Sequence, residues 1–170
     1  MIREVWDAYD AEGNKLGIDI YRDEPVPDGM HHIVVEIYLI TKDGKMLTTQ
    51  RHPNKGYPLK WEVTGGSIVK GETSKQGAIR ELLEETGIEV SEDNILLAHT
   101  EVTNPSIYKC YVAIIEHKKE IRLQEGETVD FKWVSYEEFF TMIKTEDFVC
   151  RVSDEGIRKI KKVSIEKVEE

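Results

Sequence analysis

Positive charge, cysteine and long apolar runs are all scarce in this chain. Its 170 residues include 23 Lys and Arg against 33 Asp and Glu, and the net charge of −10 argues against a broad electrostatic grip on nucleic acid. The two cysteines, Cys110 and Cys150, are too few and too far apart for a disulfide framework or a zinc site. No apolar stretch approaches a membrane span, and the first residues lack the features of a secretory signal. We therefore expect a cytoplasmic protein that binds neither nucleic acid nor a membrane.

The chain also lacks linkers and repeats. No Pro-, Gly- or Ser-rich segment divides it, and its length suits one domain with a sizeable core. Strand signals alternate with a few helix signals, which indicates an α+β fold. We expect a single domain over 1–170, with an N-terminal hairpin extension at 1–25 and a C-terminal helix at 150–170.

Local patterns place most of the elements. Residues 5–21 predict a β-hairpin around a turn at 11–14, and the turn-rich segment 52–60, HPNKGYPLK, predicts a loop near the site. Ser135 followed by Glu138 is a capping box, which predicts a helix through about residue 143. A terminal helix is expected from residue 153, with its apolar positions on the body of the protein. The predicted strands are 32–40, 45–51, 95–102, 107–115 and 131–134.

Residues 66–88, GSIVKGETSKQGAIRELLEETGI, are the most informative segment. Thr73 and Gln76 form a capping box, and Gly87 stands where a left-handed C-cap is usual, so a helix is predicted over 74–86. At about 100° per residue, three carboxylates share one face of this helix; they belong to Glu81, Glu84 and Glu85. The opposite face is expected to pack on the core, through Leu82, Thr86, Ile79 and Leu83.

Three like charges within one helical turn repel one another, so their presence makes sense if they bind a cation. Hard oxygen ligands suit Mg²⁺ or Mn²⁺, and such ions orient phosphate oxygens and generate hydroxide from a bound water. Arg80 lies one turn before Glu84 and is placed to pair with it. The segment therefore predicts a metal site for cleaving phosphate anhydrides. The alternative interpretation is a solvated acidic helix.

The same segment resembles the Nudix signature, G-x5-E-x7-R-E-U-x-E-E-x-G-U with U aliphatic, at every fixed position. These positions are Gly66, Glu72, Arg80, Glu81, Leu82, Glu84, Glu85, Gly87 and Ile88. The resemblance implies an α/β/α sandwich with a mixed central sheet. It also implies that the protein is a Nudix pyrophosphohydrolase, in which water attacks a phosphorus of a nucleoside diphosphate linked to another moiety. It also implies metal ligation by Glu81, Glu84, Glu85 and the carbonyl of Gly65, with orienting roles for Arg80, Glu72 and Gly66.

The catalytic base is less well defined than the metal ligands. In many Nudix hydrolases the base is a glutamate in a loop before the last core strand, and the matching segment here is Gln124-Glu125-Gly126-Glu127. Glu127 is therefore one candidate, and Glu81 or Glu84 is the alternative. Arg51 flanks the acidic helix in sequence and is the candidate substrate contact, because its guanidinium suits phosphate oxygens.

Two other functions stay open from sequence alone. From His31 through Arg51 to the glycine loop, the chain also resembles isopentenyl diphosphate isomerase, another Nudix-fold enzyme. That enzyme needs a cysteine and a second metal-binding histidine beside the box glycine, where this chain has Gly65 and Ser67, so we predict a hydrolase of the isomerase-like branch. The non-enzymatic alternative is a nucleotide-metabolite sensor. No motif selects among nucleotide substrates, and an N-terminal hairpin outside the core sandwich favours a homodimer.

Overall fold

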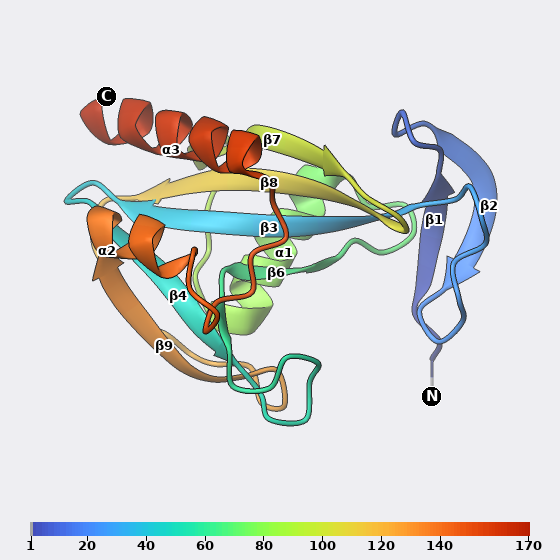
Figure 1. Cartoon of the computed structure of the whole chain (residues 1–170), viewed down its shortest axis with the longest axis horizontal. Coiled ribbons are helices and arrows are strands. Elements are labelled where there is room, and N and C mark those ends of the chain that lie inside the picture. Colours follow the sequence, from blue (N-terminus) through green and yellow to red (C-terminus); the bar gives the residue numbers. More distant parts are fainter. Residues whose placement is uncertain (1) are drawn as a thin grey trace.

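The computed structural model describes residues 2–170, and a seven-stranded sheet forms its centre (Figure 1). The strands run in the order β5-β4-β3-β8-β7, with β6 also paired to β3 and β9 to β4. β3 and β8 are parallel, whereas β3 is antiparallel to β6 and β4, so the sheet is mixed. The strands are β3 (His32–Thr41), β4 (Lys45–Arg51), β5 (Trp61–Glu62), β6 (Thr64–Ser67), β7 (Ile95–Val102), β8 (Ser106–Ile115) and β9 (Thr128–Ser135).

Helices cover both faces of this sheet (Figure 1). α1 (Ser74–Thr86) packs on β3, β6 and β8, while α2 (Tyr136–Met142) and α3 (Asp154–Glu169) lie on the other face; a 3₁₀ turn, η1 (Glu92–Asn94), precedes β7. Side chains of β3 alternate between the two cores, with Val35 and Ile37 facing α1 and Tyr38 and Ile40 facing α2 and α3. The α+β class and the α/β/α sandwich with a mixed sheet are confirmed.

The N-terminal hairpin is a separate two-stranded sheet of β1 (Val5–Tyr9) and β2 (Lys15–Tyr21), beside the start of β3 (Figure 1). Backbone hydrogen bonds of 2.9 and 2.8 Å join Tyr9 and His31 in both directions. The backbone N–H of Lys70, in the loop before α1, donates to Val5 O at 2.9 Å. The hairpin is therefore tied both to the central strand and to the loop that leads into α1.

Both predicted ends of α1 are present, but one of its faces is misassigned by the sequence prediction. The Thr73 and Gln76 capping box forms, and Gly87 adopts φ 76° and donates to Leu83 O at 2.9 Å. Leu82 is fully buried, whereas Leu83 is 39% exposed, and Glu85 is buried in its place. The buried side of the helix therefore lies about 80° around its axis from the predicted side. Glycine-rich β6 packs closely under α1, so the helix turns its small residues and Glu85 inward.

Most strand predictions agree with the structure to within one residue. β9 begins at Thr128, three residues before the predicted start at 131, and β5 and β6 were not predicted. β6 contains Gly65 and Gly66, which have low strand propensity. Cys110 is buried and Cys150 is exposed, and both are free thiols. Within residues 2–170, no helix combines the length and apolar character needed to cross a membrane.

Candidate active site

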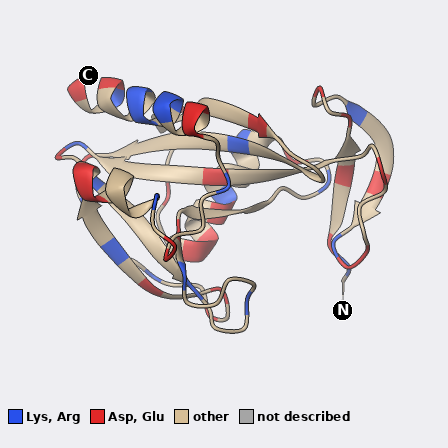
Figure 2. Cartoon of the chain, viewed as in Figure 1, with Lys and Arg blue, Asp and Glu red and all other residues tan. Residues whose placement is uncertain are grey.

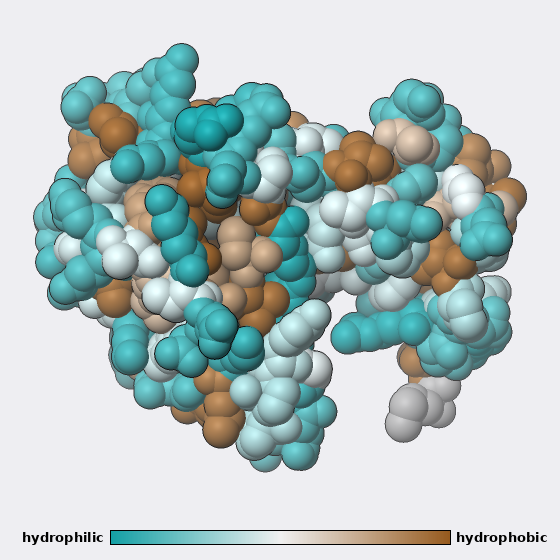
Figure 3. Space-filling model, in the orientation of Figure 1, coloured by the Kyte–Doolittle hydropathy of each residue, from teal (hydrophilic) through white to brown (hydrophobic). Residues whose placement is uncertain are grey.

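A cavity of about 520 Å³ opens beside β3, at the point where its pairing partner changes from β6 to β4. Its wall includes residues of the hairpin, of the 52–60 loop and of the loop before β9, and in Figure 3 the surface is indented between the hairpin and those loops. We call this the active-site cavity. Seven glutamates line it: Glu4, Glu36, Glu62, Glu81, Glu84, Glu85 and Glu127.

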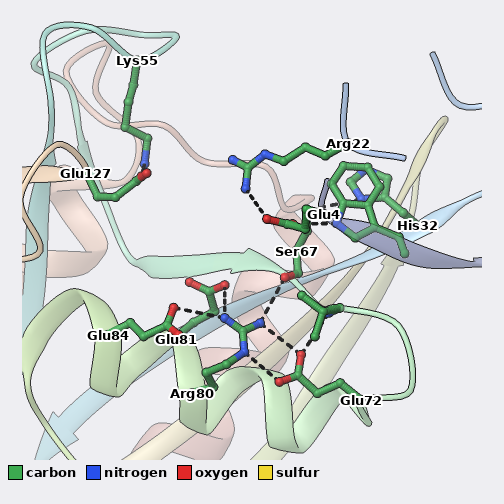
Figure 4. A network of polar contacts seen from close by, with 12 residues as sticks. Glu4, Arg22, His32, Lys55, Ser67, Glu72, Arg80, Glu81, Glu84 and Glu127 are labelled. Atoms are coloured by element: carbon green, nitrogen blue, oxygen red, sulfur yellow. Dashed lines mark hydrogen bonds and ion pairs between the residues drawn. The ribbon is translucent and has the colours of Figure 1, made fainter. Parts of the chain in front are cut away.

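Arg80 organises the floor of the cavity, as Figure 4 shows. Its guanidinium donates to both carboxylate oxygens of Glu72 at 2.7 and 3.0 Å, to Glu81 at 2.8 Å and to Glu84 at 3.1 Å. Glu72 also accepts the backbone N–H of Val69 at 3.0 Å, which fixes the loop before the helix. The predicted pairing of Arg80 with Glu84 is therefore present, within a larger network.

The floor has more buried negative charge than its cations balance. Burial raises the pKa of Glu81 to about 7, even though Arg80 beside it acts in the opposite direction. Glu85 is 3% exposed, and the hydrogen bond that it accepts from Gly65 N is long, at 3.4 Å. Burial, followed by the charge of Glu81, raises the pKa of Glu85 well above its ordinary value. A buried carboxylate without a close cation is costly, and a bound divalent ion would remove that cost.

The backbone at Gly66 is shaped to receive a carboxylate. A Cβ atom at this position would lie 2.5 Å from the carboxylate carbon of Glu81, so glycine is required for Glu81 to occupy its place. The donor set of carboxylates and a nearby backbone carbonyl suits a hard cation. Among residues 2–170, however, no three His, Cys, Asp or Glu side chains converge on one point. Arg80 holds Glu81 and Glu84 through the same Nη1 atom.

Two candidates from the sequence lie on the opposite wall with partners already in place. Glu127 is bound to Lys55 at 2.5 Å, and this pair joins the loop before β9 to the 52–60 loop (Figure 4). Arg51 lines the cavity but donates to Glu62 and to the carbonyl of Gly56, both at 2.6 Å. Arg51 therefore holds the 52–60 loop, and its role as a substrate contact stays a prediction.

Sequence reasoning missed five charged residues of the cavity wall. Glu36 is fully buried in β3, and its charge within an otherwise apolar strand is a signal that could have been noticed. Arg151 lies 3.7 Å from Glu36 and 3.6 Å from Glu62. Glu4 and Arg22 come from the hairpin, where they form a 3.0 Å ion pair, and no sequence pattern points to them.

The first residue of β3, His32, joins the hairpin to the cavity. Its ring stacks on Trp6 with centroids 4.2 Å apart, and Trp6 Nε1 donates to Glu4 at 2.7 Å. The two ring nitrogens of His32 contact the hydroxyls of Ser67 at 3.4 Å and Ser106 at 2.9 Å. His32 is thus a strand-entry residue with polar partners on both sides.

An α/β/α sandwich that buries carboxylates of one helix beneath a glycine loop defines a class of hydrolases that act on phosphate anhydrides. The model of the NUDIX domain matches residues 30–150, so the chain belongs to the Nudix hydrolase family. An uncharacterised Nudix hydrolase of Listeria monocytogenes is 27% identical over 151 residues, covering 86% of this chain and 88% of that protein.

Two further matches support this assignment. The CTP pyrophosphohydrolase of Escherichia coli is 36% identical over 70 residues, which cover 41% of this chain and 52% of that protein. A crystal structure from Deinococcus radiodurans superimposes with a TM-score of 0.70 at 20% identity, covering 92% of this chain and 97% of that one. The first of these matches concerns an enzyme that acts on a nucleotide, and the second concerns the fold alone.

Proposed function

We propose that this Nudix hydrolase cleaves a phosphoanhydride bond of a nucleoside diphosphate derivative or a related nucleotide, with Mg²⁺ or Mn²⁺ as cofactor. Glu81, Glu84, Glu85 and the carbonyl of Gly65 would hold the metal. The observation that carries the proposal is one cavity that contains the buried carboxylate of Glu85 and the Glu81 side chain, which is 13% exposed, with too little positive charge to balance them. When bound, the metal supplies charge neutralisation to the phosphate oxygens and acidifies a water molecule.

The protein's own residues would position the ligands. Arg80 and Glu72 fix the loop and the helix relative to each other, because their two hydrogen bonds span the interval between them. Gly66 leaves room for the carboxylate of Glu81. Glu84 is the most exposed of the three acids, with 45% of its side chain accessible, so its ion pair with Arg80 is the easiest to open. The similarity to the CTP pyrophosphohydrolase of Escherichia coli supports hydrolysis of a phosphoanhydride as the reaction.

The general base is either Glu127 or a glutamate of the helix. Glu127 lies on the cavity wall, where Lys55 holds it in place. Its side chain faces the cavity without being buried, so it is the candidate for proton transfer outside the helix. The variant Glu127→Gln distinguishes the candidates. If Glu127 is the base, kcat falls by about a hundredfold or more while metal affinity stays the same; if Glu81 or Glu84 is the base, kcat changes by less than about tenfold.

The proposal is tested by incubating the full chain with a panel of nucleoside diphosphates, nucleoside triphosphates and ADP-ribose. Release of phosphate, pyrophosphate and nucleoside monophosphate is measured with Mg²⁺, with Mn²⁺ and with excess chelator. We expect hydrolysis only when a divalent cation is present. Equal activity in chelator would refute the metal requirement. Conversion of isopentenyl diphosphate to its isomer, assayed beside a no-enzyme control, would support the rival isomerase.

A further inference from the structure

A second hollow adjoins the active-site cavity, and we call it the lateral pocket. It measures about 370 Å³, which is within the range of about 300–1,000 Å³ of small-molecule sites. Tyr108 and Arg151 line both hollows. The remaining residues of the lateral pocket are Tyr57, Lys60, Phe148, Val149 and Cys150. Since two residues are shared, one ligand with two chemically different parts can occupy both spaces.

The two hollows differ in charge. Seven glutamates line the active-site cavity, whereas none of the residues lining the lateral pocket is acidic. The lateral pocket instead combines three aromatic rings with the cations of Lys60 and Arg151. The first environment suits metal-bound phosphates, and the second suits an uncharged planar group next to an anion.

Tyr57 is presented to the lateral pocket by a strained loop. Tyr57 and Leu59 adopt φ of 52° and 60°, which non-glycine residues rarely do, and such strain gathers at ligand-binding sites. Arg51 fixes the loop through hydrogen bonds with the backbone of Gly56 and Leu59 at 2.6 and 3.2 Å. Tyr57 is nevertheless 61% exposed. A costly backbone conformation thus keeps an aromatic face open to a ligand.

Arg151 marks the passage between the two hollows. Its guanidinium lies 3.6 and 3.7 Å from the carboxylates of Glu62 and Glu36, which is longer than a hydrogen bond. Its side chain stays 27% exposed. The cation is therefore placed to meet a phosphate that enters the acidic cavity from the lateral pocket.

We propose that the lateral pocket binds the nucleobase of the substrate, stacked on Tyr57, while the phosphates pass Arg151 into the active-site cavity. This inference rests on the proposed function and deepens it, because it makes a nucleoside part of the substrate. Stacking on an aromatic ring tolerates any base. The pocket would therefore select for the presence of a base more strongly than for its identity.

Calorimetric titration without metal tests the pocket separately from catalysis. The full chain is titrated with adenosine, guanosine, cytidine, uridine and D-ribose, which lacks a base. We expect at least one nucleoside to bind and ribose not to bind. Tyr57→Leu should weaken nucleoside binding by about five- to a hundredfold, the range for loss of one base-stacking ring, and Tyr57→Phe by less than about twofold.

Leu59→Ala is the matched control, because Leu59 lies in the same loop with the same backbone strain and similar exposure but does not line the pocket. Melting temperatures within about 2 °C of the parent verify folding. In steady-state assays, Tyr57→Leu should raise KM for a nucleoside diphosphate and leave kcat unchanged.

The outcomes separate this inference from the proposed function. Absence of nucleoside binding in the parent, equal binding of ribose, or unchanged affinity in Tyr57→Leu overturns the nucleobase pocket, even if the protein hydrolyses nucleotides. Nucleoside binding that depends on Tyr57, in a protein that hydrolyses no anhydride with Mg²⁺ or Mn²⁺, supports the pocket and refutes the proposed function.

Discussion

The floor of the active-site cavity is formed by Arg80 and its glutamate partners. Its rim, formed by the hairpin, the 52–60 loop and the loop before β9, is built in a different way. On the floor, Arg80 binds three glutamates at once, and each partner is fixed by the helix or by the loop before it. On the rim, Arg22 pairs with Glu4 and Lys55 pairs with Glu127, so each cation has one carboxylate partner, and three of these four side chains are about a third or more exposed. Exposed pairs are weak and exchange partners easily. The floor is therefore held in one arrangement by a shared cation, whereas the ion pairs of the rim can open at little cost.

The largest effect is expected on the floor. Glu81→Gln and Glu85→Gln should each lower turnover by at least about a hundredfold, since each removes a charge that stabilises the transition state. Neither variant should lower the melting temperature, because each removes a buried negative charge. Glu89→Gln, an exposed residue just beyond α1, is the control. Near-normal turnover in both floor variants would refute the metal-site assignment, and a collapse of the fold would mean that these carboxylates are structural.

Arg80→Lys should have the next largest effect. Lysine keeps the charge but cannot make the two parallel hydrogen bonds to Glu72, so the free energy of unfolding should fall by about 1–2 kcal/mol. Turnover should also fall, because the loop before α1 loses its fixed position. Urea unfolding and kinetics check both effects, with Arg158→Lys on the exposed face of α3 as control. A variant as stable as the parent would show that the floor is no more organised than the rim.

Acid should weaken the contact between hairpin and cavity through His32. Burial, helped by the charge of Arg22, lowers the pKa of His32 to about 4 from an ordinary 6.5. In the unfolded chain His32 is therefore protonated as the pH falls below 6.5, whereas in the folded protein it is protonated only near pH 4. The stability associated with neutral His32 is present above pH 6.5 and is lost as the pH falls toward 4.

The magnitude, reduced for partial exposure, is roughly 1 kcal/mol between pH 7 and 5. Urea unfolding at the two pH values measures it in the parent and in His32→Gln, which lacks the titrating group. An equal pH dependence in both proteins would contradict the assignment to His32.

The smallest effect is expected on the rim. Arg22→Gln should raise KM for a nucleotide by no more than about fivefold, with kcat and melting temperature unchanged, because Arg22 is exposed. Arg3→Gln is the matched control, since Arg3 lies on the same hairpin and pairs with Asp23 and Glu24 away from the cavity. A large loss of kcat in Arg22→Gln would place the hairpin among the elements that act in the chemical step.

The floor could be predicted from sequence because its interactions are local. The capping box of Thr73 and the left-handed Gly87 follow from nearest-neighbour rules, and the spacing of the glutamates follows from the helical repeat. The orientation of α1 could not be predicted, because it depends on how closely β6 approaches. The charged residues spread along α3 likewise predict a surface helix from local sequence alone (Figure 2).

The rim could not be predicted because its partners are far apart in the chain. Lys55 and Glu127 are 72 residues apart, and Glu4 and Arg22 meet only because β1 and β2 pair in register. Arg151 faces Glu36 across more than a hundred residues of sequence. Each contact depends on tertiary packing, and no local spacing encodes it. Glu36 is the exception, since a charge in the middle of a buried strand is visible in the sequence.

The segment that matches the NUDIX domain, residues 30–150, contains every proposed metal ligand but not Glu4, Arg22 or Arg151. The proposed metal ligands thus lie within the family segment, while part of the cavity wall belongs to the flanking segments. Under the proposed function, mutations in those segments would change how the substrate is bound while leaving the proposed metal ligands in place, so substrate choice and metal binding could vary independently.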